Sequence, residues 1–166
     1  MKNTEFQLLL GLLLHQKLQY IERTLNLVCL GFGKLLERKD RHSVTDEIAE
    51  YSIHIQCPFR ILLNNKIVLG SDDLFLSQFP DIESVDLNIK DSCLFDYKSK
   101  SLIQKFNNEI IIGVDMNKQN DLILYTSNLT IQLFVCNNQF ESWRFFKFDD
   151  ESIQIVIDED NQGTDD

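Results

Sequence analysis

The stretch EYSIHIQCPFRILLNNKIVLG, residues 50–70, decides the fold. In its first half apolar and polar residues alternate, with one face formed by Tyr51, Ile53, Ile55 and Cys57 and the other by Ser52, His54 and Gln56. This period of two predicts a β-strand with one buried face. Pro58 has no N–H to give to a sheet, so it marks an edge or a bulge. The Asn64-Asn65 pair then predicts a turn, after which residues 66–75 fold back as the second strand of a hairpin.

Strand signals return in quick succession after residue 108, in the runs EIIIGVDM, DLILYT, LTIQLFVC, RFFKF and SIQIVID. Short polar connections, residues 117–120 and 127–128, separate the first three runs. Runs this close together leave no room for crossover helices, which disfavours a parallel α/β sheet. We therefore expect an antiparallel meander at the C-terminal end of the chain.

The remaining segments predict helices and one more strand. A leucine-rich run predicts a buried helix over residues 5–18, and a second helix is expected over residues 94–106. Residues 20–29 alternate like a strand, whereas the charged residues 37–50 have the character of an exposed loop. Together these patterns predict an α+β fold, in which a mostly antiparallel sheet of about six to eight strands packs against one or two helices. We expect a single domain over residues 1–157, followed by an acidic C-terminal tail over residues 158–166.

Composition excludes several classes of protein. With 43% apolar residues in 166, the chain is predicted to bury a hydrophobic core. Its most apolar stretch, residues 6–14, is nine residues long, whereas a membrane-spanning helix needs about 20. No signal-peptide pattern is present, so we expect a cytoplasmic protein without a membrane partner. The four cysteines lack metal-ligand spacing and no cofactor motif occurs, which predicts free thiols, no metal and no cofactor.

Charge is unevenly distributed along the chain. Residues 149–166 contain eight acidic and no basic residues, while the other 148 residues carry 18 acids and 16 bases. Such an acidic end repels nucleic acid and attracts a basic partner, and it is also typical of a solvated tail that aids solubility. We therefore expect no direct binding to DNA or RNA.

One set of polar residues is compatible with a small-molecule site. His54 and Gln56 share a face of one strand, and Arg60 and Asp72 come from the adjoining hairpin, together with Ser71 and Asp73. An imidazole beside a carboxylate can act as a general base, and an arginine can hold an anion. The alternative is that this face is the solvated side of an antiparallel sheet.

A second set surrounds the single tryptophan in FESWRFFKF, where Trp143 is flanked by Glu141 and Arg144. Trp and Arg are the residue types that most often dominate protein interfaces, so this cluster is a candidate binding surface. The alternative places Trp143 in the core, with Arg144 paired to an acid.

The ordered segments ERTLNLVCLGFG, EYSIHIQCPFRI, IVLGSDDLF, SCLFD and ESWRFF resemble a family of small uncharacterised bacterial proteins, in which motifs of the form HIQCPWRI, GS-D and CWRFF occur in the same order. The resemblance spans about residues 18–146 and departs at Phe59, where the family motif has Trp. It implies a compact α+β domain and no particular activity.

By size and charge alone, the chain is similar to immunity proteins of bacterial toxin systems, which bind a toxin and block it. We therefore expect a non-catalytic protein-binding module, of an immunity or regulatory type, that neutralises a basic partner such as a nuclease-like toxin. A minor variant is a mimic of nucleic acid. The alternative is a small-molecule-binding protein or an enzyme built around His54, Gln56, Arg60 and Asp72. The oligomeric state is left open.

Overall fold

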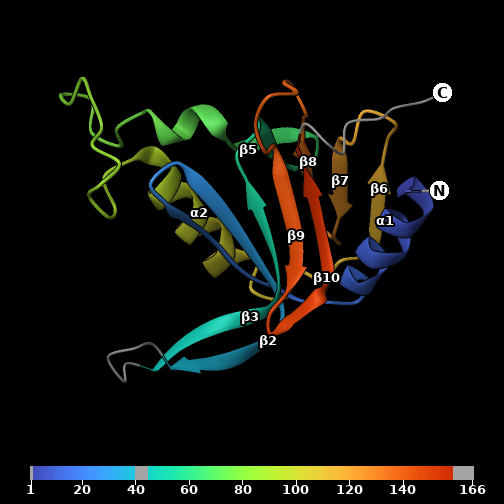
Figure 1. Cartoon of the computed structure of the whole chain (residues 1–166). Coiled ribbons are helices and arrows are strands. Elements are labelled where there is room, and N and C mark those ends of the chain that lie inside the picture. Colours follow the sequence, from blue (N-terminus) through green and yellow to red (C-terminus); the bar gives the residue numbers. More distant parts are fainter. Residues whose placement is uncertain (1, 40–44, 159–166) are drawn as a thin grey trace.

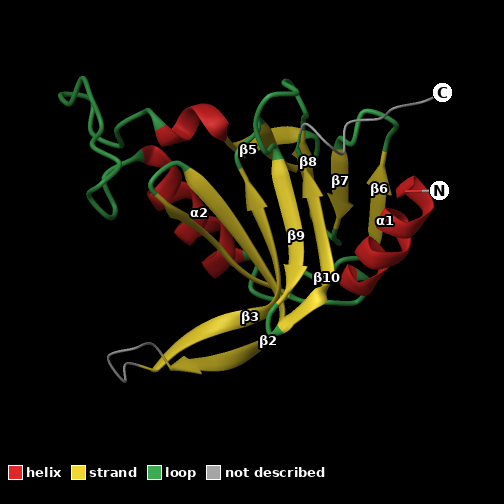
Figure 2. Ribbon diagram, viewed as in Figure 1, coloured by secondary structure: helices red, strands yellow, loops and turns green. Residues whose placement is uncertain are grey.

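The computed structural model describes residues 2–39 and 45–158, which form ten strands and two α-helices in the α+β arrangement that the sequence predicts (Figures 1 and 2). All strand pairs are antiparallel, and the strands divide into two five-stranded sheets. Sheet 1 has the order β1 (Leu18–Thr24), β2 (Leu27–Lys39), β3 (Thr45–Ile55), β9 (Trp143–Lys147) and β10 (Asp150–Ile157). Sheet 2 has the order β5 (Lys66–Gly70), β4 (Phe59–Leu63), β8 (Leu129–Leu133), β7 (Leu122–Tyr125) and β6 (Gly113–Met116).

The core lies between the two sheets, and the helices close its two open sides. Residues that alternate along the strands point inward and are fully buried, among them Ile53, Phe145, Ile61 and Ile131. Helix α2 (Leu94–Lys105) contacts β1 and β5, and helix α1 (Lys2–Leu10) contacts β10 and β6 (Figure 1). Each helix thus lies beside the edge strands at one side of the sandwich, where unpaired strand edges would otherwise be exposed.

Pro58 stands where the chain passes from one sheet to the other. β3 ends at Ile55 in sheet 1 and β4 begins at Phe59 in sheet 2. The hairpin of β4 and β5 is confirmed, and its turn residues Asn64 and Asn65 have φ values of 50° and 62°. Positive φ at both central positions is what a type I′ hairpin turn requires. The predicted edge or bulge at Pro58 is thus a corner between sheets.

The C-terminal strands do not form one continuous meander. β6, β7 and β8 are consecutive neighbours in sheet 2, as predicted, but β9 and β10 belong to sheet 1. Residues 134–142 make the crossing, and the N–H groups of Gln56 and Cys57 donate to the carbonyl of Ser142 beside it. The described residues form more strands than the six to eight expected. One reason is that residues 18–39 form a hairpin of two strands, and the other is that residues 37–50, expected as a loop, are largely strand.

Three local expectations are corrected. Residues 20–29 do not make one strand, because the chain turns at Leu25, whose φ is 54°. The charged residues 37–50 are not a loop, since Glu37–Lys39 and Thr45–Glu50 extend β2 and β3 into a ribbon that leaves the sheet; residues 40–44 lie outside the described residues. The first helix ends at Leu10, a 3-10 turn follows at Gly11–Leu13, and Leu8 is exposed.

The acidic C-terminal end is not one patch. Asp149 and Asp150 lie at the turn between β9 and β10, whereas Asp158 follows the far end of β10. An eight-residue strand separates them, which spans about 25 Å. Residues 159–166, which carry the other predicted tail acids, lie outside the described residues. None of the helices within residues 2–158 that the structure describes is long and apolar enough to cross a membrane.

Candidate functional site

The four residues of the predicted small-molecule patch do not meet. His54 and Gln56 belong to the outer face of sheet 1, whereas Arg60 lies on β4 of sheet 2, where its Nε donates to Gln132 Oε1 at 2.6 Å and its guanidinium lies 5.1 Å from the Phe134 ring centre. Asp72 is exposed on the short 3-10 turn Ser71–Leu74. The corner at Pro58 separates the two halves of this set, so the grouping expected from one hairpin is wrong.

His54 and Gln56 instead meet two residues of the tryptophan cluster. Arg144 donates through Nε to Glu141 Oε1 at 2.7 Å and pairs with its other oxygen through Nη2, and Gln56 donates to Glu141 at 3.4 Å. His54 lies opposite Arg144 in the β3–β9 register, with its ring edge-on to Phe146 at 4.8 Å. Four of the seven candidate site residues thus form one polar group on the outer face of sheet 1, in which His54, Glu141 and Arg144 are half-buried and Gln56 is exposed.

This group has no activated nucleophile among its described neighbours. Burial lowers the pKa of His54, and the nearby charge of Arg144 lowers it further against the opposing effect of Glu141, which favours the neutral imidazole. Cys29 lies opposite His54 on β2, but burial, with the neighbouring charge of Glu22, raises the pKa of the Cys29 thiol to about 11. A neutral thiol beside a neutral imidazole is not the ion pair that nucleophilic catalysis by cysteine needs.

Trp143 is a core residue, which corrects its assignment to a binding surface. Its side chain is 0% exposed, and its indole N–H donates to the carbonyl of Asn120 at 2.9 Å. Because the residue alternates inward on β9, its bulk fills the space between the sheets, while Arg144 on the opposite face pairs with Glu141. The structure therefore agrees with the alternative in which Trp143 belongs to the core and Arg144 pairs with an acid.

The sequence patterns missed the loop of residues 75–92, which joins the 3-10 turn Ser71–Leu74 to α2. Figure 1 shows it reaching out from the body beside α2, in yellow-green. Loops longer than about 12–15 residues without regular structure are uncommon in small domains, and those that occur are either functional or linker and disordered segments. The large apolar side chains exposed along it are Phe75, Leu76, Phe79, Ile82 and Ile89. We call residues 75–92 the acidic loop, for the charges described below.

The two ends of the acidic loop are fixed to the body. At its start, buried Asp73 accepts hydrogen bonds from Gly70 N at 2.9 Å and from Lys98 Nζ on α2 at 2.8 Å. The N–H of Leu94 donates to the carbonyl of Leu76 at 2.7 Å, which closes the base of the loop. The middle of the loop therefore projects from a firm base.

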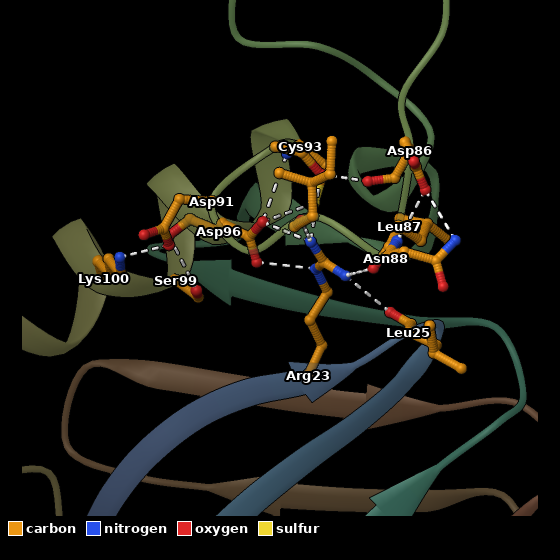
Figure 3. Close-up of polar contacts among 12 residues, drawn as sticks. Arg23, Leu25, Asp86, Leu87, Asn88, Asp91, Cys93, Asp96, Ser99 and Lys100 are labelled. Atoms are coloured by element: carbon orange, nitrogen blue, oxygen red, sulfur yellow. Dashed lines mark hydrogen bonds and ion pairs between the residues drawn. The ribbon is translucent and has the colours of Figure 1, made fainter.

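The returning limb of the loop is held by Arg23 of β1 (Figure 3). The guanidinium donates to the carbonyls of Leu25, Leu87 and Ile89 at 2.9–3.0 Å and to Ser92 Oγ at 3.3 Å. It also makes a two-point ion pair with Asp96 of α2, in which both side chains are buried, with 5% and 11% exposed. Every N–H of Arg23 is therefore used within the protein.

Asp96 also caps the N-terminus of helix α2, which begins at Leu94. Its carboxylate accepts hydrogen bonds from the N–H of Cys93 at 3.3 Å and from the Cys93 thiol at 3.2 Å. Burial alone would raise the pKa of Asp96, but the hydrogen bonds from Arg23 and Cys93 outweigh it and hold that pKa below its usual value. One carboxylate thus joins the loop limb, the β1 strand and the start of α2.

Residues 79–82 of the acidic loop form a β-turn, which we call the loop tip. The N–H of Ile82 donates to the carbonyl of Phe79 at 3.2 Å, and Pro80 occupies the position after Phe79, which such turns favour. Phe79 N also donates to Ser77 Oγ at 3.0 Å. The turn displays Phe79 and Ile82 at its two ends, 56% and 50% exposed, with Asp81 between them.

The exposed charges of the acidic loop are mostly negative. Its acids are Asp81, Glu83, Asp86 and Asp91, against Lys90 as its one base. Asp91 pairs with Lys100 of α2, and Asp86 accepts from Asn88. Asp81 and Glu83 make no hydrogen bond or ion pair with any described residue. The tip therefore presents apolar side chains beside two uncompensated carboxylates.

A cavity of about 600 Å³ lies behind the returning limb, between β1 and α2. Its lining includes Ile21, Leu25, Leu87 and Ile103, with Arg23 and Asp96 among the polar residues.

Within residues 2–39 and 45–158, no group of three or more His, Cys, Asp or Glu side chains could hold a metal ion. No protein-family model, curated protein or solved structure matches the chain.

Proposed function

We propose that the protein is a non-catalytic binding module, of an immunity or regulatory type, that docks a basic protein partner through the tip of the acidic loop. The observation that carries this proposal is the Phe79–Ile82 turn, where two large apolar side chains are exposed beside the carboxylates of Asp81 and Glu83. Exposed apolar clusters rimmed by charge are typical of protein interaction sites.

The ordered structure of the acidic loop favours a role in binding over a role as a solvated connection. Side chains that are already held in place lose less conformational entropy on association. The turn at Phe79, the base at Leu76 and the Arg23 clamp provide such order without burying the apolar tip. A solvated loop of equal length would have no need of aromatic and β-branched residues at its tip.

Charge selects the class of partner. The chain has a formal net charge of −10, and the loop tip adds uncompensated acids where the apolar groups are exposed. A second copy of this chain would be repelled, whereas a partner with a basic surface would be attracted and its encounter accelerated. A nuclease-like toxin, whose substrate site must be basic, has the appropriate chemistry.

The proposal is tested by capture from the native host at low salt. We expect a basic protein to be retained by wild type, lost with the double variant Asp81→Lys/Glu83→Lys, and lost with Phe79→Ser/Ile82→Ser. Glu37→Lys/Glu47→Lys is the charge-matched control on the β2–β3 ribbon, and Ile67→Ser is the apolar control. Retention by both loop variants, or equal loss with the controls, would show that the loop is not the docking site.

A further inference from the structure

The inner walls of the cavity between β1 and α2 offer apolar contact. All N–H groups of Arg23 donate to acceptors within the protein, and both carboxylate oxygens of Asp96 accept hydrogen bonds from Arg23 or Cys93. Ser99 Oγ donates to the carbonyl of Asp96 at 3.2 Å. A polar group placed against Arg23 or Asp96 would lose its hydration without gaining a free partner, which costs free energy. The apolar part of the lining consists of the side chains of Ile21, Leu25, Leu87 and Ile103.

The rim of the cavity carries one positive charge that has no partner among the described residues. Lys90 lines the cavity and makes no hydrogen bond or ion pair within the described parts of the chain. Lys100 pairs with Asp91, and the charges of Arg23 and Asp96 balance each other. Glu22 also borders the cavity, but on β1 it lies opposite Cys29 and close enough to affect its thiol, so its carboxylate is turned to the outer face of sheet 1.

We infer that this cavity binds an amphipathic anion, a molecule with an apolar body and a single carboxylate, sulfate or phosphate head. The apolar body lies between β1 and α2, and the head lies at the rim beside Lys90. The volume of about 600 Å³ falls within the range of about 300–1,000 Å³ that is typical of small-molecule sites. Sugars and nucleotides are disfavoured, because Arg23 and Asp96, the buried charged groups of the lining, are already occupied by partners within the protein.

This site is independent of the proposed docking tip. The cavity lies behind the returning limb and is walled by Leu87, whereas Phe79 and Ile82 stand beyond the loop base. A ligand that binds the folded state alone stabilises it in proportion to its saturation of the site. Occupancy would therefore raise the unfolding temperature and protect the amides of residues 86–92 from exchange.

Titration of the purified protein with dodecanoate tests the inference, followed by calorimetry and thermal unfolding. We expect saturable one-to-one binding, with 1-dodecanol binding about 10-fold more weakly. Ile103→Trp, which fills the cavity, should abolish binding, whereas Ile67→Trp on the β5 edge should not. Lys90→Glu should weaken binding about 10-fold, and Lys66→Glu should leave it unchanged.

Lys90 is exposed, so its variant tests the head-group contact even if Ile103→Trp fails to fold. Competition by phosphatidylglycerol vesicles would identify a membrane-borne amphiphile as the source of the ligand, and its absence a free one. No saturable binding of dodecanoate, or binding that is unchanged by both Ile103→Trp and Lys90→Glu, would overturn the inference.

Discussion

Arg23 on β1 and Asp96 on α2, 73 residues apart in sequence, share a two-point ion pair with Nε–Oδ1 and Nη2–Oδ2 distances of 2.8 Å and 2.7 Å. The same guanidinium holds the carbonyls of Leu87 and Ile89, so the pair joins an edge strand, a helix start and the returning limb of the acidic loop. The position of the returning limb therefore depends on one buried charge pair.

Removal of one partner of this pair should be costly, because the other charge is left buried. Asp96→Asn is expected to lower the free energy of unfolding by about 3 kcal/mol. Arg23→Lys should not preserve the two-point contact with Asp96, since an ammonium cannot make the two parallel hydrogen bonds of a guanidinium. Denaturant unfolding measures the first effect, and hydrogen exchange at residues 86–92 should show faster opening of the limb in both variants. Unchanged exchange there would contradict the clamp.

Stability should fall in acid. The hydrogen bonds that Asp96 and Glu109 accept hold their pKa values below the usual 3.8 and 4.5, against the opposing effect of burial. The unfolded chain then binds more protons than the folded one, so the unfolding free energy is retained above about pH 5 and falls as the pH drops through the folded-state values. Glu109→Gln, which loses the charged contacts to Thr126 and Asn128, should show a shallower acid slope than wild type. An acid slope for Glu109→Gln equal to that of wild type would contradict this account.

Gly31 is required because the ring of Tyr20 lies over it. A Cβ at residue 31 would stand 2.2 Å from Tyr20 Cζ, so the ring must move and its hydroxyl would lose the N–H of Ala49. Gly31→Ala should lower the unfolding free energy by about 1–3 kcal/mol. Gly11→Ala is the matched control, because a Cβ there meets nothing within 4 Å. In the Tyr20→Ala background the cost of Gly31→Ala should shrink, and full additivity of the two changes would contradict the steric account.

Trp143 provides an optical check of the core. As the single tryptophan and fully buried, it should emit at short wavelength and resist quenching by acrylamide in the folded state. Trp143→Phe removes the hydrogen bond to Asn120 and part of the packed volume, so it should cost about 1–3 kcal/mol in urea unfolding. Emission typical of a water-exposed indole would contradict the assignment.

Local patterns predicted the local structure well. The β4–β5 hairpin with its Asn64-Asn65 turn, the meander β6–β7–β8 and helix α2 all follow from alternation, turn residues and helix propensity. Membership of a sheet is not local, since nothing near Pro58 specifies that β3 and β4 part. For this reason the sequence pattern groups His54 with Arg60, although the two residues lie in different sheets.

The acidic loop was missed for a related reason. Its apolar residues have no period, and its order depends on Arg23, which lies more than 60 residues away in sequence. A detectable signal was present, namely a long aperiodic stretch that combines Phe79 and Ile82 with several acids. The alternatives for the tryptophan cluster could not be separated by sequence, because alternation alone does not say which face of β9 is buried.

Site-specific photo-crosslinking in the native host tests the docking claim most directly, with Phe79→p-benzoylphenylalanine compared with Ile67→p-benzoylphenylalanine on β5. Both positions are exposed, by 56% and 63% respectively, but only the first belongs to the loop tip. The account predicts one basic protein crosslinked from position 79 and not from position 67, and lost when Asp81→Lys/Glu83→Lys is added. No adduct from position 79, or the same adducts from both positions, would contradict it.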